Sequence, residues 1–162
     1  MTDLRVHPYT AAEPGIFANS YLLECEDGVV LVDANLLVSD ARALAARLAA
    51  LRKPLLAAFV THAHPDHFNG LPYVAGDDVP VYATAAVAET IGEIALPKRE
   101  QWQPLYGDEW PDRYRVPDHP WRPERSWRSA GCASRCTVSA RRRATPTPTF
   151  SSTRVRGGGL HR

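Results

Sequence analysis

Four side chains that can bind a metal ion fall within six residues of this 162-residue sequence. They are His62, His64, Asp66 and His67, and they directly follow an apolar run at residues 55–60. Imidazole and carboxylate ligands together suit a borderline divalent cation: Zn²⁺ is the first expectation, and Fe or Mn are compatible. The spacing therefore predicts a metal site at the point where a buried strand ends.

The residues around these ligands indicate how the backbone runs. Pro65 keeps His64 extended, because the residue before a proline is pushed out of the helical region. Proline is tolerated in the first turn of a helix, so Asp66 and His67 are expected where strand gives way to helix. If the strand stays extended to its end, the first two histidines and Asp66 project to one side. Gly70 allows another backbone segment to pass close by.

The pattern His-x-His-x-Asp-His resembles the motif of the metallo-β-lactamase superfamily. The resemblance implies an α/β fold, the αββα sandwich of two similar halves, with the metal site at the edge where the halves meet. Residues 1–118 resemble the first half. By the same resemblance, His62 and His64 would bind a first metal ion, and Asp66 and His67 a second, so one or two Zn²⁺ ions are expected.

The implied chemistry is hydrolysis of a small-molecule substrate. Zn²⁺ lowers the pKa of its bound water to ~7, and the resulting hydroxide would attack an ester, thioester, lactam or phosphoester centre. Asp66 would be the catalytic residue, orienting the nucleophile and passing a proton to the leaving group. Asp33 matches the family's aspartate that supports the ligand histidines, although a turn residue at a strand end is an equal alternative. Thr61 is expected to be structural.

The sequence lacks the ligands that the family draws from its second half. The family needs a third histidine for the first metal, a bridging aspartate and a last histidine. Only His119 and His161 remain downstream, and the surroundings of both favour a solvated loop residue. His7 lies on a polar N-terminal segment and is a weaker candidate still. As written, the chain supplies half of a binuclear site, so impaired activity is expected.

The surrounding segments alternate between strand and helix patterns, which indicates a layered α/β domain. Strands are expected over residues 4–9, 19–25, 29–33, 55–60 and 79–82, with a hairpin turn at residues 26–28.

The helices have their own signals. Ser39 is expected to cap a helix whose apolar stripe contains Leu44, Leu48 and Leu51. A short helical turn would bury Phe68, Leu71 and Val74, and a further helix is expected over residues 84–94. Residues 96–120 are expected to form a long loop, which is held down by aromatic side chains and overhangs the site or covers the sheet.

Charge and composition change abruptly near residue 120. Residues 1–120 carry 9 Lys+Arg and 17 Asp+Glu, whereas residues 121–162 carry 10 Arg and 1 acidic residue. An Arg/Ser/Pro/Gly-rich tail over residues 119–162 buries too little apolar surface to offset its ordering entropy, so disorder is expected. The change favours a truncated chain with an out-of-frame tail. The codons permit a shifted reading with two strands about a Gly-Gly turn, which the nucleotide sequence would test.

Two other classes of function stay open. The arginines at 141–143, with Trp121 and Trp127, would suit a nucleic-acid-binding or nuclease-like protein, although an arginine-only tail fits a shifted frame better. Cys132 and Cys136 would suit a non-catalytic zinc-binding protein.

The sequence gives only a few signals about the cellular compartment and the partners of the protein. No signal peptide and no apolar stretch of ~20 residues is visible. Three cysteines make a poor disulfide framework, so a cytoplasmic protein without a membrane partner is expected. The substrate and the oligomeric state stay open.

Overall fold

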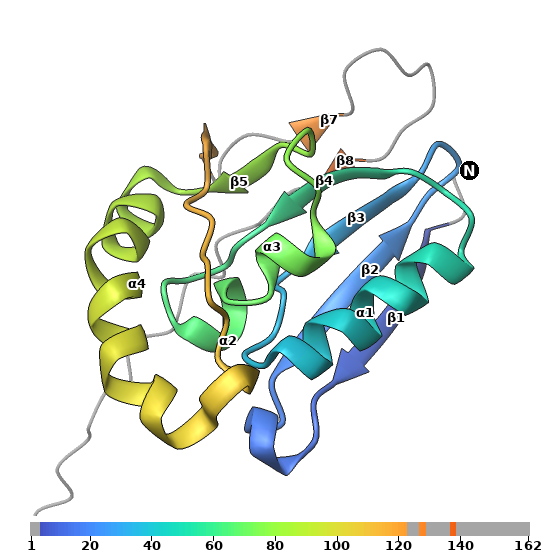
Figure 1. Ribbon diagram of the computed structural model, residues 1–162. Helices are drawn as coiled ribbons and strands as arrows, with labels where there is room; N and C mark the ends of the chain where they lie inside the picture. Colours follow the sequence, from blue (N-terminus) through green and yellow to red (C-terminus); the bar gives the residue numbers. More distant parts are fainter. Residues whose placement is uncertain (1–3, 123–126, 129–136, 139–162) are drawn as a thin grey trace, which may run out of the picture.

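The computed structural model describes residues 4–122, 127–128 and 137–138, and its main feature is a six-stranded sheet (Figure 1). The strands, in their order across the sheet, are Arg5–Thr10 (β1), Asn19–Glu24 (β2), Val29–Val32 (β3), Leu55–Phe59 (β4), Val81–Ala83 (β5) and His119–Pro120 (β6). β1, β2 and β3 are antiparallel neighbours, whereas β3 to β6 run parallel. The expected α/β class is confirmed.

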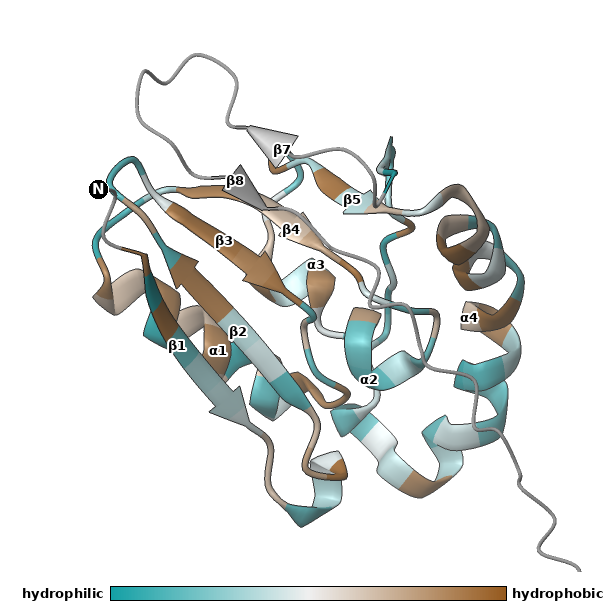
Figure 2. Ribbon diagram, turned by 180° about the vertical axis from the view of Figure 1, so that it is seen from behind, coloured by the Kyte–Doolittle hydropathy of each residue, from teal (hydrophilic) through white to brown (hydrophobic). Residues whose placement is uncertain are grey.

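Among the described residues, four α-helices accompany the sheet: Val38–Ala50 (α1), Pro65–Phe68 (α2), Leu71–Val74 (α3) and Ala85–Tyr106 (α4). Two short 3-10 helices, Glu13–Gly15 (η1) and Gly107–Glu109 (η2), complete this part of the chain. α1, α2 and α3 lie on one face of the sheet, and α4 lies at the side of the sheet formed by β5 and β6 (Figure 1). In the reverse view the strands lie in front of these helices (Figure 2). A separate antiparallel pair joins Trp127–Arg128 (β7) to Thr137–Val138 (β8).

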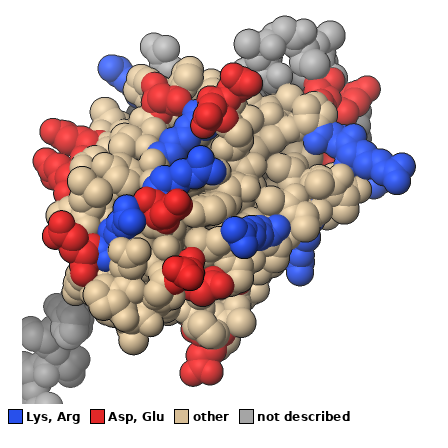
Figure 3. All heavy atoms as spheres, viewed as in Figure 1, with Lys and Arg blue, Asp and Glu red and all other residues tan. Residues whose placement is uncertain are grey.

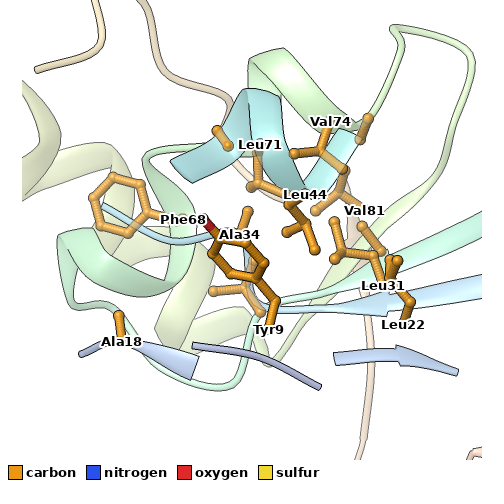
Figure 4. Close-up of a cluster of buried hydrophobic side chains, with 14 of the residues drawn as sticks. Tyr9, Ala18, Leu22, Leu31, Ala34, Leu44, Phe68, Leu71, Val74 and Val81 are labelled. Carbon is orange, nitrogen blue, oxygen red and sulfur yellow. The ribbon is translucent and has the colours of Figure 1, made fainter. Parts of the chain in front are cut away.

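The core lies between the sheet and the helices, where the apolar stripes of both meet (Figure 4). Leu31 from the sheet, Leu44 from α1, Phe68 from α2 and Leu71 from α3 are all fully buried. Burying a side chain of this size contributes about 1.5–3 kcal/mol. Phe68 directly follows His67 in the chain, so the packing that stabilises the core also anchors the metal motif.

The local sequence patterns correspond closely to several elements. β2 and β3 pair through Glu24 and Val29, and the turn closes with the Cys25 amide donating to the Gly28 carbonyl at 2.9 Å, so the predicted hairpin is confirmed. The predicted stripe on α1 is also confirmed, since Leu48 and Leu51 pack against the core beside the buried Leu44. The predicted burial of Phe68, Leu71 and Val74 is confirmed as well, although they lie on two short helices, α2 and α3, rather than on one helical turn.

The predicted N-cap at Ser39 is wrong. α1 begins at Val38 with Leu37 at the N-cap position, so Ser39 lies inside the helix. The start of the helix is fixed by burial of Leu37 against Trp110, which is 4% exposed. The Ser39 amide donates instead to the Glu109 carboxylate at 3.0 Å, so the cap comes from a segment 70 residues away.

The predicted loop over residues 96–120 is wrong for its first half. α4 continues to Tyr106 with Pro97 and Pro104 inside it. Each proline removes one helical hydrogen bond, yet the last turns of α4 are held by packing, because Trp102 and Tyr106 pack against the buried Trp110 cluster. The aromatic side chains therefore hold down a helix end rather than a loop.

The part of the chain assigned to a tail is described only in places. His119 and Pro120 form β6, in which His119 pairs with Tyr82 of β5. The rest of the predicted tail, apart from residues 121–122 and the β7–β8 pair, lies outside the described residues. Within the described part, no helix is long and apolar enough to cross a membrane.

Candidate metal centre

Parallel pairing of β3 and β4 brings two polar segments to the same edge of the sheet. Asp33 follows β3 and Thr61 follows β4, and the carboxyl ends of parallel strands meet at one edge. The Asp33 amide donates to the Phe59 carbonyl at 2.9 Å, and the Thr61 amide donates to Asp33 Oδ1 at 2.9 Å. The hydrogen bond of the Thr61 amide goes to a side chain rather than to a backbone carbonyl, because β4 ends at Phe59 and the strand pairing stops there.

The strand does not stay extended through the motif, so the condition for a shared direction of the first two histidines and Asp66 is not met: residues 62–64 bend, and Asp66 lies in a helix. The expected change from strand to helix is confirmed. His64 is extended (φ −101°, ψ 143°) and caps α2, with Pro65 at its first position. Asp66 and His67 consequently lie in the first turn of α2.

The segment after β3 is attached to the motif by its backbone. The Ala34 amide donates to the His67 carbonyl at 2.9 Å, and the Gly70 amide donates to the Asn35 carbonyl at 3.1 Å. Asp33 and Asn35 both have positive φ, 58° and 67°, a conformation that Asp and Asn adopt more readily than most residues. Asp33 thus forms the turn at the strand end and also faces the motif, so both interpretations of this residue from the sequence have structural support.

Three imidazole rings of the motif lie together. The ring centroids of His62 and His64 are 4.7 Å apart, and those of His62 and His67 are 3.8 Å apart. Asp66 joins the group because its Oδ2 lies 3.0 Å from His67 Nε2. All four predicted ligands are therefore neighbours in space.

Asp33 is the acceptor that connects these groups. Its side chain is nearly buried and receives three hydrogen bonds: from the Thr61 amide (2.9 Å), the Thr61 hydroxyl (2.7 Å) and His67 Nδ1 (2.8 Å). Thr61 was expected to be structural. Its position directly before the first histidine was the one signal of its importance, and the contact with Asp33 depends on strand pairing.

The surroundings of His62 and His67 shift the pKa values of these two histidines in opposite directions. Burial lowers the pKa of His67, but hydrogen bonds with Asp33 and Asp66 outweigh that effect and raise it to about 9. Burial lowers the pKa of His62, and the neighbouring His67 and His64 lower it further. The hydrogen bond from His67 holds the pKa of the Asp66 carboxyl below its usual range. Without metal, His67 is thus an imidazolium between two carboxylates.

These hydrogen bonds determine how the cluster relates to a metal ion. Among the residues that the structure describes, no group of three or more His, Cys, Asp or Glu side chains is arranged to hold one. Both ring nitrogens of His67 are occupied, one by Asp33 and the other by Asp66. The donor set still fits a borderline cation by its chemistry, since three imidazoles and a carboxylate lie on one short segment. Binding requires His67 to leave Asp66 and release a proton.

The two other histidines in the described part of the chain, His7 and His119, pair with acidic side chains outside the cluster. His119 is half exposed on β6, with Nδ1 2.6 Å from an oxygen of Asp118. His7 on β1 pairs with Glu24 on β2 at 2.9 Å. His161 lies outside the described residues.

The residues behind the two alternative functions are only partly described. Trp121 packs edge-on against Phe59, with ring centroids 5.5 Å apart. The face seen in Figure 3 carries intermixed basic and acidic side chains rather than one basic patch. Cys132, Cys136 and the arginines at 141–143 lie outside the described residues, as does the side chain of Trp127.

Open α/β sheets bind their ligands at the carboxyl ends of the strands, and here that edge carries a loop rich in histidine and aspartate. The family model of the metallo-beta-lactamase superfamily matches residues 14–135, a range that contains every residue of the cluster. The chain belongs to this superfamily. The resemblance in the motif is thereby confirmed, and the match extends past residue 118.

Two solved structures with TM-scores above 0.5 resemble this chain in fold. BLEG-1 B3 metallo-beta-lactamase is 23% identical with a TM-score of 0.58, covering 78% of this chain and 57% of that one. Metallo-beta-lactamase IND-7 is 20% identical with a TM-score of 0.54, covering 78% and 51%. FIM-1 from Pseudomonas aeruginosa, solved in a mono-zinc form, is 20% identical with a TM-score of 0.46, covering 58% and 46%. The chain thus spans about half the length of these proteins. A search of curated proteins found no match.

Proposed function

We propose that this protein is a metal-dependent hydrolase that binds its cation, Zn²⁺ by ligand type, through His62, His64, Asp66 and His67. The observation that carries the proposal is the meeting of three imidazoles and a carboxylate at the end of β4, in a chain of the metallo-β-lactamase superfamily. When bound, such a cation makes a water acidic near neutral pH and polarises the substrate oxygen that gains negative charge.

The side chains have separate tasks in this proposal. His62 and His64 supply neutral nitrogen donors, and the low pKa of Asp66 keeps its carboxylate ionised at neutral pH. Asp66 also accepts a hydrogen from the attacking water and passes it to the leaving group. Asp33 orients His67 through the 2.8 Å contact with Nδ1. His67 Nε2, which contacts Asp66 in this structure, would then be the nitrogen that binds a cation.

The substrate in this proposal is a small molecule with an ester, thioester, lactam or phosphoester group. The small number of cysteines is consistent with a cytoplasmic protein.

The test is hydrolysis by the full chain, first stripped of metal and then loaded with one equivalent of Zn²⁺ or Mn²⁺. One chromogenic substrate of each class is supplied: a cephalosporin, an aryl ester, an aryl thioester and a bis-aryl phosphate. We expect metal-loaded protein to turn over at least one substrate, and the activity to disappear with a chelator and in H62A/H64A. His119→Ala removes a histidine outside the cluster and should keep the activity.

Three results would contradict the proposal. The first is hydrolysis that persists unchanged without metal. The second is equal activity of H62A/H64A and the parent protein. The third is no turnover of any of the four substrates by protein that has bound its metal stoichiometrically, which would leave a zinc-binding protein without hydrolase function.

A further inference from the structure

The hydroxyl of Thr61 lies between two groups of the cluster. Its oxygen is 2.7 Å from Asp33 Oδ2 and 3.0 Å from His62 Nδ1. We propose that Thr61 is a positioning residue, whose hydroxyl keeps the hydrogen of His62 on Nδ1 and so leaves the Nε2 lone pair free for a cation. The part of this inference that concerns the cation rests on the proposed function; the part that concerns the imidazole does not.

The inference follows from counting hydrogens. A threonine hydroxyl has one hydrogen to donate and two lone pairs to offer, whereas a carboxylate only accepts. Asp33 is surrounded by donors, since the Thr61 amide and His67 Nδ1 also point at it, at 2.9 and 2.8 Å. The single hydrogen of the Thr61 hydroxyl is therefore committed to Asp33.

With that hydrogen committed, the hydroxyl can offer His62 only a lone pair. His62 Nδ1 must then be the donor in the 3.0 Å contact. A neutral imidazole carries one ring hydrogen, so a hydrogen on Nδ1 leaves Nε2 without one. When the ring is protonated both nitrogens carry a hydrogen, and the contact with Thr61 keeps the one on Nδ1, so a metal would displace the proton on Nε2.

The surroundings of Thr61 make this orientation stable. The backbone of Thr61 is held by the hydrogen bond from its amide to Asp33 Oδ1, and the Asp33 side chain is only 6% exposed. If the hydroxyl hydrogen turned away from Asp33, the hydroxyl oxygen and Asp33 Oδ2 would face each other at 2.7 Å with no hydrogen between them, which is unfavourable. Through Asp33, the same threonine is also linked to His67, so one side chain orients two rings of the motif.

The test is direct observation of the ring nitrogens by long-range ¹H–¹⁵N NMR on metal-free, full-length protein at pH 8. The His62 signals are assigned by their loss in H62Q. We expect a protonated-type shift for Nδ1 and an unprotonated-type shift for Nε2. In T61V both nitrogens should move toward intermediate shifts as the two tautomers mix, whereas T61S should retain the pattern of the parent protein.

A matched control separates this effect from the general loss of a threonine hydroxyl. Thr90 on α4 donates its hydroxyl to the Ala86 carbonyl at 2.8 Å, so T90V removes a hydrogen bond of another kind. T90V should leave the His62 shifts unchanged. A hydrogen found on Nε2 of His62 in the parent protein would overturn the inference, as would a T61V spectrum identical to that of the parent.

Metal affinity gives a second measurement. Loss of a group that orients a metal ligand typically weakens binding about 10–100-fold, so T61V should bind Zn²⁺ more weakly by about that factor, and T61S should not. Absence of zinc binding in the parent protein would refute the proposed function, while the NMR pattern would still decide the role of Thr61. If T61V fails to fold, the spectra of the parent protein and T61S still show which ring nitrogen of His62 carries the hydrogen, and a hydrogen on Nε2 would overturn the inference.

Discussion

Gly70→Ala should disturb the metal loop without changing any ligand. A Cβ added to Gly70 would collide with the Ala34 carbonyl oxygen and lie 2.8 Å from the Cβ of Ala41. That carbonyl cannot retreat easily, because the Asp33 amide is bonded to Phe59 and the Ala34 amide to the His67 carbonyl, each at 2.9 Å. Any adjustment moves Asp33 away from the motif that it supports.

The size of the effect follows from three contributions. Overpacking a site of this kind costs about 1–3 kcal/mol. Weakening the 3.1 Å bond from the Gly70 amide to the Asn35 carbonyl costs about 1 kcal/mol more. Since the φ of Gly70 is an ordinary −75°, alanine also restricts the unfolded chain, which returns about 0.4–1 kcal/mol. The net loss in the free energy of unfolding is about 1–3.5 kcal/mol, and each kcal/mol corresponds to about 2–4 °C in Tm.

The assay is urea and thermal unfolding followed by circular dichroism. Gly92→Ala is the matched control: it lies in α4, and an added Cβ meets nothing within 4 Å. That change should raise the free energy of unfolding by about 0.5–1 kcal/mol. If G70A is as stable as the parent protein, or gains stability as G92A does, the close packing between the loop after β3 and the motif is not as described.

Three further predictions concern the scaffold around the site. Glu109→Gln weakens the cap on the Ser39 amide, so the free energy of unfolding measured in urea should be about 0.5–1 kcal/mol lower than that of the parent protein. Burial and the hydrogen bond to Asp40 raise the pKa of Tyr9 to about 12. The unfolded chain therefore ionises Tyr9 near pH 10 while the folded chain does not, so stability should fall between pH 10 and 12, and less steeply in Tyr9→Phe when urea midpoints are compared. Phe68→Ala empties a fully buried position next to the motif and should lower the free energy of unfolding by about 3–5 kcal/mol, measured by the same assay.

Local patterns predicted the elements whose causes are local. The hairpin depends on a short polar turn between two apolar runs, and the stripe on α1 depends on the spacing of Leu44, Leu48 and Leu51. The change from strand to helix depends on Pro65, which restricts the residue before it and suits the first turn of a helix. Each of these signals lies within a few residues of the structure that it determines.

The elements that the sequence misjudged depend on distant contacts. The start of α1 is set by Glu109 and Trp110, about 70 residues downstream of Leu37 and Ser39. The end of α4 contains two prolines that argue against a helix, and packing against Trp110 outweighs them. Neither contact can be inferred until the chain is folded.

The candidate site shows the same division. The type and spacing of its four ligands are visible in the sequence because they lie on one segment. The contact between Asp33 and Thr61 is not, because it joins residues 28 apart through the parallel pairing of β3 and β4. The open choice between a turn residue and a supporting carboxylate at Asp33 required this geometry, in which Asp33 contacts both the turn and His67.

Zinc titration of the metal-free full chain, followed at each histidine by ¹⁵N NMR, tests the metal site most directly. One equivalent of Zn²⁺ should produce large shifts at the ring nitrogens of His62, His64 and His67, and leave those of His7 and His119 in place. Tight binding that shifts His7 or His119 instead, or an excess of zinc that shifts none of the three motif histidines, would contradict a metal centre at the end of β4.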